Sequence, residues 1–322
     1  MSHITKLLDA LRDTDAVSER LRELEPDQDI LRENLEGIRR RREVLAMQLN
    51  KELRSSQSDL VQYHVKKNED ERYPVLAVAR AVAGFQELVT SVFDALRSAP
   101  KKQYRPQADN VALSTLDFAM ALPVGSVLVS MSVENDRLLA VKSDLDQTFD
   151  RVFEIMNTRD SERLRSLADV VGIASISKAH DWAATAANFG LNTKIEIQKD
   201  LKSEPQRIEI SNSQAQILKE IIEEKSDKQI DLETVVGELL GIDVDPNPDQ
   251  SYFHIETIDK RRITGKLDSS FSRTRSWAVH VVYTARIAKV TTTKYSTGEE
   301  RVEWLLVFLE PFAGQLTGPE GV

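Results

Sequence analysis

The last quarter of the chain carries the pattern that most constrains its fold. Between about 233 and 311, short runs rich in β-branched and aromatic residues are separated by clusters of glycine, proline and aspartate. The predicted strands are Val235–Asp243, Tyr252–Ile258, Arg262–Phe271, Ala278–Lys294 and Arg301–Leu309. Five short strands in about 80 residues suit a sheet that closes on itself. The pattern predicts a small five-stranded β-barrel, OB-like or SH3-like, over 229–311, followed by a tail at 312–322.

The first 58 residues have helical periodicity. Apolar side chains follow alternating steps of four and three from Val17 to Leu49, as the seam of a coiled coil requires. Pro26 interrupts this seam, and the acidic residues just behind it suit the start of a new helix. We expect helices at about 2–24 and 27–58, folded as a coiled-coil-like hairpin; one long kinked helix is the alternative. The residues predicted to bind a protein partner or a second copy are Leu21, Leu24, Leu31, Leu35 and Ile38.

Residues 59–228 predict a mixed α+β region. The expected elements are a polar linker or short strand at 59–73, a helix at 75–97, a loop at 98–110, strands at 111–122 and 126–133, helices at 136–157 and 160–189, strands at 193–198 and 206–210, and a helix at 213–224. The helix at 75–97 is the longest apolar stretch, but Arg80, Glu87 and Asp94 interrupt it. We therefore expect a buried helix and no membrane association. The whole chain is predicted to be an α+β protein.

Bulk composition narrows the functional classes. The net charge of −9 disfavours nucleic-acid binding by the chain as a whole but leaves room for local basic patches. The chain has no cysteine, which excludes disulfides, thiolate metal sites and cysteine nucleophiles. The segment from Met1 to Lys6 lacks the apolar core of a signal peptide. We expect a cytoplasmic protein without a cofactor.

The predicted barrel is the one candidate for binding nucleic acid. OB-like folds bind single strands by stacking bases on aromatic side chains and by pairing phosphates with lysine and arginine. The candidate contact residues are Lys260, Arg261, Arg262, Arg273, Arg275 and Trp277. Strand alternation places several other aromatic residues in the barrel core, so a protein-docking or purely structural barrel is the competing interpretation.

Several charged motifs resemble functional sites but lack a required part. The run from Arg39 to Arg42 points around the whole circumference of a helix, which favours a solvated face over a phosphate site. His180-Asp181 resembles the metal-binding pair of HD phosphohydrolases, but the other four histidines lie in different segments. The strand from Thr193 to Lys199 resembles the acidic-x-Lys strand of metal-dependent nucleases, yet Gln198 occupies the lysine position. None of these patterns predicts a metal site.

Three functions follow from these patterns. The first is a non-catalytic assembly or adaptor protein, which oligomerises or docks a partner through its N-terminal helices and presents the barrel for recognition. The second is a module that binds single-stranded nucleic acid through the barrel. The third is a hydrolase with a dispersed site. The chain contains none of the common phosphate-loop, nucleophile-elbow, zinc-protease or dinucleotide motifs, so we favour a protein that is not an enzyme.

Overall fold

The structure is a computed structural model of the 322-residue chain, and it describes residues 3–23, 28–67, 74–123, 127–135, 142–199, 204–245, 251–272 and 276–312. The helices in these ranges are α1 (His3–Glu23), α2 (Gln28–Ser55), α3 (Val75–Arg97), α4 (Ala108–Ser114), α5 (Asp144–Asn157), α6 (Ser161–Asn188) and α7 (Asn212–Glu223). The strands are β1 (Ser58–Lys67), β2 (Asp117–Pro123), β3 (Val127–Glu134), β4 (Leu191–Gln198), β5 (Gln206–Ile210), β6 (Ser226–Asp243), β7 (Tyr252–Thr257), β8 (Arg262–Leu267), β9 (Val282–Lys294) and β10 (Glu300–Pro311). This content confirms the predicted α+β class.

The chain divides into two compact units. Unit 1 comprises Met1–Lys225 and Tyr295–Gly298, and unit 2 comprises Ser226–Lys294 and Glu299–Val322. The return of the chain to unit 1 is anchored by Tyr295, which is buried and donates its backbone N–H to the Lys225 carbonyl at 3.1 Å. This division into two units does not test the predicted domain borders near residues 58 and 228, which stay predictions. Most of the predicted tail at 312–322 lies outside the described residues.

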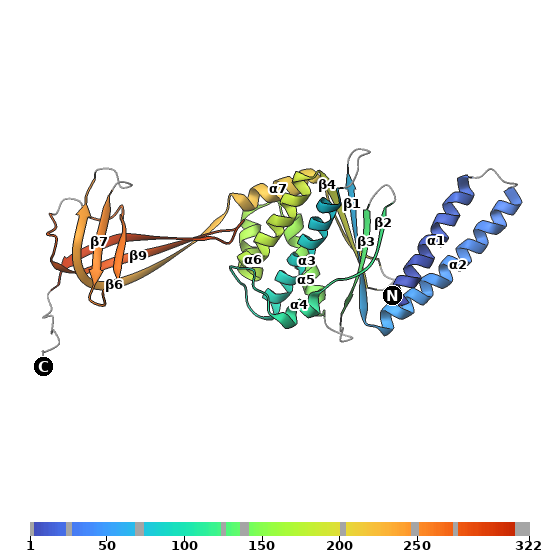
Figure 1. Ribbon diagram of the computed structural model, residues 1–322, viewed down its shortest axis with the longest axis horizontal. Coiled ribbons are helices and arrows are strands. Elements are labelled where there is room, and N and C mark those ends of the chain that lie inside the picture. Colours follow the sequence, from blue (N-terminus) through green and yellow to red (C-terminus); the bar gives the residue numbers. More distant parts are fainter. Residues whose placement is uncertain are drawn as a thin grey trace. The chain divides into compact units, whose positions relative to one another are not determined.

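Unit 1 is built on an antiparallel sheet with the strand order β2-β3-β1-β4-β5. Figure 1 shows α3, α5, α6 and α7 on one face of this sheet and the pair α1 and α2 on the other side. Alternation along β1 explains both contacts: Val61, Tyr63 and Val65 lie in the core beneath the helices, whereas Leu60 joins a separate cluster with residues of α1 and α2. The central strand thus carries apolar contacts on both faces.

Local sequence accounts for several helix boundaries in unit 1. Helices α5 and α7 begin with capping boxes formed by Ser143 and Ser211, and Asp160 caps α6 through two backbone N–H groups. Helix α6 is interrupted at Gly172, whose φ of 80° lies in the region that only glycine adopts readily. Gly190 follows α6 with a φ of 66°, a conformation that glycine commonly adopts just after a helix.

Unit 2 is a sheet whose strand pairings form a closed ring in the order β10-β8-β7-β6-β9, with β9 also paired to β10. All neighbouring pairs are antiparallel except β10 and β8, which are joined by a short parallel ladder. Its interior is a cluster of buried residues that includes Leu239, Phe253, Tyr283 and Leu306. This cluster is separate from the two clusters of unit 1, so each unit has its own core.

The structure corrects several predicted boundaries. The segment predicted as a strand at 111–122 begins as helix α4, which is held by Asn110 donating to Asp94 at 2.8 Å, and only 117–123 is extended. The segment 59–73, for which a linker was one interpretation, contains the central strand β1. Helix α5 starts at Asp144 because Ser143 caps it, and the residues before it at 136–141 lie outside the described part.

In unit 2 the predicted strands are correctly located but their ends differ. Strand β6 starts at Ser226 instead of Val235, because its ladder with β9 continues as far as the Ser226–Lys294 pair. Strand β8 ends at Leu267 and β9 begins at Val282, so both are shorter than the predicted strands. Pairing with neighbouring strands decides where each strand begins and ends. The periodicity of a single strand's sequence contains no information about that pairing.

Candidate functional site

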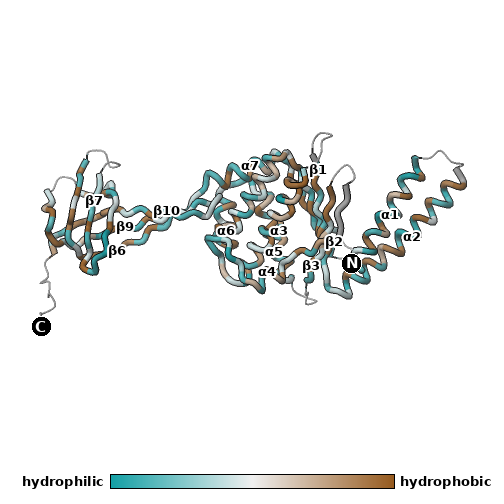
Figure 2. The backbone as a smooth tube through the Cα atoms, in the orientation of Figure 1, coloured by the Kyte–Doolittle hydropathy of each residue, from teal (hydrophilic) through white to brown (hydrophobic). Residues whose placement is uncertain are grey.

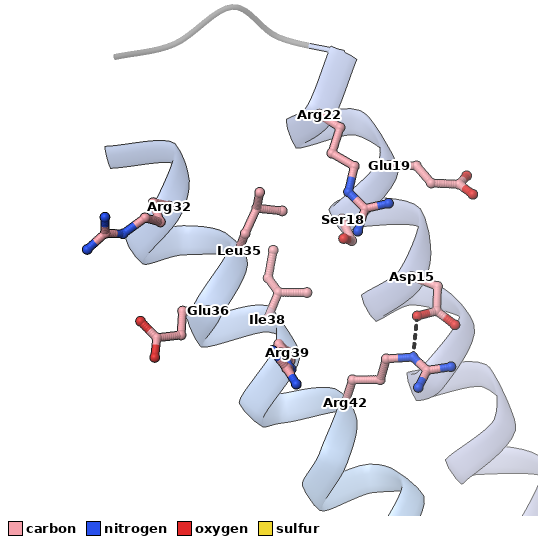
Figure 3. Close-up of a pocket in the computed structure, with 10 residues that line it drawn as sticks. All are labelled: Asp15, Ser18, Glu19, Arg22, Arg32, Leu35, Glu36, Ile38, Arg39 and Arg42. Atoms are coloured by element: carbon pink, nitrogen blue, oxygen red, sulfur yellow. Dashed lines mark hydrogen bonds and ion pairs between the residues drawn. The ribbon is translucent and has the colours of Figure 1, made fainter. Parts of the chain in front are cut away.

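A groove lies between the distal halves of α1 and α2 in unit 1. It has a volume of about 700 Å³, and Figure 3 shows the ten residues that line it. Leu35 and Ile38 point from α2 toward α1, while Glu19 and Glu36 point outward along the rims. The groove therefore has an apolar centre and charged edges.

The two halves of the α1–α2 pair are packed differently. Near the sheet, the seam is closed by six buried side chains, which are Ile4, Leu7, Leu8, Leu49, Leu53 and Leu60. Farther along, the predicted partner-binding residues Leu21, Leu31, Leu35 and Ile38 are only half-buried. Leu24 lies outside the described residues. The predicted seam residue Val17 is 47% exposed and does not belong to the seam, which corrects the register on α1.

Small and polar residues on α1 explain why the distal half stays open. Thr14 is buried and its hydroxyl donates to the Ala10 carbonyl at 2.7 Å, so it adds little side-chain volume between the helices. Ser18 lines the groove one turn farther on. Two helices alone cannot enclose Leu35 and Ile38 when their neighbours on α1 are this small. The apolar centre of the groove consequently remains accessible.

Among the described residues, an ion pair between Arg42 and Asp15 connects the two walls of the groove. The Arg42 guanidinium donates to Asp15 at 2.8 Å, and this bond is the dashed line in Figure 3. Two other members of the arginine run form pairs within α2, Arg39 with Glu43 and Arg40 with Glu36. These side chains are mostly exposed, so each pair contributes about 0–1 kcal/mol. The arginine run is thus a solvated face joined to α1 at one point.

Three charged residues of the groove have no ion pair within the described part of the chain. They are Glu19, Arg22 and Arg32. Arg22 and Arg32 lie nearer the distal end than the Asp15–Arg42 bridge (Figure 3). The groove therefore presents both signs of charge to an incoming surface.

Three of the residues of unit 2 predicted to bind nucleic acid form ion pairs with acidic side chains. Lys260 and Arg262 both bind Glu256, at 2.9 Å and 3.0 Å, and Arg261 binds Glu233 at 3.0 Å. The hydrogen bond from Lys260, supplemented by that from Arg262, holds the pKa of Glu256 below its usual range. These three cations are thereby partly neutralised.

Of the remaining predicted residues, only Trp277 lies within the described part of the chain, and it is half-buried. Trp277 packs against Phe271 and Tyr283, with ring centroids 5.7 Å and 5.9 Å apart. Arg273 and Arg275 lie outside the described residues. Trp304 has Arg261 and Lys289 near its ring, at 5.7 Å and 5.9 Å from the centroid.

His180 belongs to a polar network that joins α6 to α7. Its Nε2 lies 3.0 Å from Glu223 and its Nδ1 lies 3.8 Å from Asp181. The nearby Asp181 carboxylate, helped by the hydrogen bond to Glu223 and opposed by burial, raises the pKa of His180. Among the described residues, no group of three or more His, Asp or Glu side chains has the geometry to hold a metal ion. In this geometry, His180 and Asp181 therefore belong to the polar contact between α6 and α7.

The strand motif at 193–199 likewise forms ion pairs with its neighbours. Glu196 accepts from Lys194 at 2.9 Å and lies 3.5 Å from His64 on β1, while Lys199 pairs with Asp146 at 2.7 Å. Burial lowers the pKa of His64 despite the nearby Glu196 carboxylate. Glu196 and Lys199 thus contact different partners, and they do not converge on one site.

A second groove, which sequence reasoning missed, lies between α3 and the β2–β3 edge of the sheet. It has a volume of about 730 Å³ and is lined by apolar residues that include Val78, Val82, Phe118 and Val129. Phe118 is 67% exposed. The available signal was the high apolar content of α3, much of which is brown in Figure 2. A helix of this kind leaves an apolar stripe uncovered when the helix layer is incomplete.

Helix α3 is also the one described helix long and apolar enough, by length and composition, to cross a membrane. Its buried residues, among them Phe85, Leu88 and Val92, belong to the core of unit 1. Core helices of soluble proteins meet the same criterion, so this property alone is weak support for a membrane span.

Comparison with known proteins yields no relative: no family model, no curated protein and no solved structure matches this chain.

Proposed function

We propose that this chain is a non-catalytic assembly or adaptor protein, which associates through the distal α1–α2 groove and presents unit 2 to a further partner. The observation that carries the proposal is the half-buried seam of Leu21, Leu31, Leu35 and Ile38 beyond a fully closed base. An apolar seam that two helices leave open is completed when further helices pack on it. We infer self-association as the first use of this groove, with a cytoplasmic location.

The helical pair is proposed to be a coiled-coil-like hairpin. In its support, α1 and α2 are connected by the Arg42–Asp15 bridge, and the seam on α2 follows steps of four and three through Leu31, Leu35 and Ile38. Helices of this kind commonly serve to meet other helices.

Unit 2 is proposed to be an OB-like or SH3-like recognition barrel. Its closed ring of strand pairings and separate apolar core support this interpretation. A protein partner is favoured over nucleic acid because Lys260, Arg261 and Arg262 are paired with acidic side chains.

The self-association proposal is tested by light scattering after size exclusion of the full chain. We expect wild type to be oligomeric, and Leu35→Glu combined with Ile38→Glu to weaken association by roughly 100-fold or more, since charged groups would enter the apolar centre. The matched control is Val44→Glu with Met47→Glu, because both residues lie on α2 but are 48% and 64% exposed. Equal effects of the two double variants, or a monomeric wild type, would contradict self-association through this groove.

Binding of single-stranded nucleic acid by unit 2 is the second candidate, and the cluster of Trp304 with Arg261 and Lys289 favours it. The test is fluorescence anisotropy of a labelled oligonucleotide with the full chain at low salt. Under this candidate, Lys289→Ala weakens binding and reduces its salt dependence. A lack of binding at low salt removes the candidate.

A further inference from the structure

Strand β6 of unit 2 has a strand on each side near its end but on only one side at its start. Its ladder with β9 runs from Ser226 to Glu238, whereas its ladder with β7 covers only 237–243. Within the described residues, no strand pairs with the second side of β6 over 226–236, and this stretch is called the free edge of β6. Its sequence contains no proline, and its ladder with β9 contains no bulge. The devices that commonly block strand addition at an edge are thus absent from 226–236.

Hydrogen bonds at the two ends of the free edge show which of its backbone groups face away from β9. The Val236 carbonyl accepts from the Ile258 N–H at 3.2 Å, on the β7 side. The Lys225 carbonyl accepts from the Tyr295 N–H at 3.1 Å, on the β9 side. Successive residues of a strand direct their backbone groups to alternate sides. The even-numbered residues of 228–234 therefore direct their N–H and C=O groups to the free edge, where no described group binds them.

The side chains of the same even-numbered residues begin an apolar strip. Ile230 and Leu232 are 63% and 65% exposed. In the ladder they lie opposite Val290 and Ala288, and Ala288 lies opposite Leu305 of β10. Residues that lie opposite each other share one face of a sheet, so these five residues form a strip across three strands. A strand added at the free edge would lengthen this strip by one row.

The odd-numbered side chains of the free edge point to the other face and include three acids, Asp227, Asp231 and Glu233. Glu233 binds Arg261 at 3.0 Å, whereas Asp227 and Asp231 have no ion pair within the described part of the chain. Lys289 lies opposite Asp231 in the ladder, but its Nζ lies 5.9 Å from the centre of a tryptophan ring of β10. This face of the free edge therefore offers two unpaired carboxylates to an added strand.

These acids disfavour pairing with the free edge of a second copy. In an antiparallel pair of two such edges, even-numbered residues lie opposite even-numbered ones and odd opposite odd. Joining Ile230 to Ile230 places Asp227 opposite Glu233. Joining Ile230 to Leu232 places Asp231 opposite Asp231, and joining Leu232 to Leu232 places Asp231 opposite Glu233. Each register that joins the apolar side chains thus sets two like charges opposite each other, which is destabilising.

We propose that unit 2 binds an extended segment of a partner protein as an added strand at the free edge of β6, and that this segment alternates apolar and basic residues. The outward backbone groups of 228–234 supply the hydrogen bonds. Ile230 and Leu232 contact the apolar side chains of the segment, and Asp227 and Asp231 contact the basic ones. This rests on the proposed function of unit 2 as a recognition module for a protein partner, and it adds the binding edge and the chemistry of the partner.

The experiment uses the full chain and two labelled synthetic peptides of equal length, in which valine alternates either with lysine or with glutamate. Fluorescence anisotropy should show that the lysine peptide binds at least about 10-fold more tightly. Hydrogen exchange with mass spectrometry should show that this peptide increases protection of 226–236, because it pairs the outward N–H groups. Equal affinity of the two peptides, or a gain of protection confined to other segments, would overturn the proposal.

A proline variant tests the backbone pairing. Ile230→Pro removes an outward N–H without removing a hydrogen bond to β9, and it should weaken binding of the lysine peptide by about 10-fold or more. The matched control is Val302→Pro on β10, where the residue is 44% exposed. Because the Glu299 carbonyl accepts from the Lys294 N–H of β9, alternation directs the Val302 N–H away from β9 as well. An equal loss of binding in both variants would overturn the proposal, since general destabilisation would then explain it.

A charge variant tests the partner's chemistry without altering the backbone. Asp231→Lys should weaken binding of the lysine peptide by about 10-fold and strengthen binding of the glutamate peptide. Glu310→Lys, the same charge change at an exposed position of β10, should leave both affinities unchanged. Equal weakening by the two variants would overturn the proposal, because general attraction to an acidic chain would then explain binding. Absence of binding by either peptide would also overturn it, while self-association through Leu35 and Ile38 would stand or fall by light scattering alone.

Discussion

At the scale of single residues, two positions determine how the loop after α3 is held. Asp94 is buried and accepts hydrogen bonds from the Gln107 backbone N–H, Lys101 and Asn110. Burial opposes its charged form, but these bonds together hold the pKa of Asp94 below its usual range. On α6, the break at Gly172 lets the Lys101 carbonyl accept from the Ala174 N–H at 2.9 Å. The loop is thus fixed at both Asp94 and Gly172.

Replacing Gly172 with alanine should therefore destabilise unit 1. A Cβ atom there would lie 2.4 Å from the Lys101 nitrogen, and the φ of 80° is itself unfavourable for alanine. We expect a loss of more than about 2 kcal/mol in the free energy of unfolding, measured by urea titration with circular dichroism. Gly37→Ala is the control, because its helical site is open and alanine there should add about 0.5–1 kcal/mol. Equal stability of the two variants would contradict the close contact at Gly172.

At the scale of elements, unit 1 depends on polar contacts between neighbouring helices as well as on its apolar core. His180 on α6 binds Glu223 near the end of α7, and Lys178 on α6 binds Glu87 on α3 at 2.9 Å. Helices α1 and α2 are likewise connected by an ion pair, between Asp15 and Arg42. The apolar seam between them is not closed at that point along the helices. The distal half of this helical pair is consequently the least enclosed helical segment of the described unit.

The contact between α6 and α7 should make stability depend on pH. The folded-state pKa of His180 is raised above its unfolded value near 6.5, so its stabilising contribution is fully present below about pH 6.5. That contribution is lost as pH rises through the higher folded-state pKa. Because the Glu223 side chain is 43% exposed, we expect at most about 1 kcal/mol.

The measurement compares wild type with His180→Gln by urea unfolding at about pH 5.5 and about pH 9. Wild type should exceed the variant in stability at the lower pH, and the difference should shrink at the higher one. A difference that is independent of pH would show that the His180 charge does not contribute. His254→Gln provides a control, because within the described residues that imidazole forms a hydrogen bond with the uncharged Thr264 hydroxyl.

At the scale of the whole molecule, the two units have separate apolar cores. Unit 2 closes through the short parallel ladder between β8 and β10, where the backbones approach very closely at Gly265. A Cβ atom at Gly265 would lie 2.0 Å from the Trp304 carbonyl oxygen, so no larger residue fits without moving the ladder. Closure of the ring is therefore the sensitive point of this unit.

Gly265→Ala should accordingly disrupt unit 2 while leaving unit 1 folded. Hydrogen exchange with mass spectrometry should show lost protection in β8 and β10 and unchanged protection in α3 and α6. Gly241→Ala is the matched control within the same sheet, since its nearest contact is a His254 side-chain atom at 3.4 Å. Loss of protection in both units would contradict this prediction, because it would mean that the two units unfold together.

The α+β class, the helix at 75–97, the strand at 206–210 and the general positions of the five strands of unit 2 were predictable from the sequence, because local periodicity specifies them. Other features depended on contacts between distant segments. Asn110 bonded to Asp94 turned a predicted strand into α4, and pairing with β9 extended β6 to Ser226. The groove between α1 and α2 also depended on such contacts. Periodicity identified Leu31, Leu35 and Ile38 as apolar seam residues, but only the packing of α1 showed which half of the seam stays open. Sequence determines which face of an element is apolar, whereas tertiary structure decides what covers that face, because burial depends on partners remote in the chain.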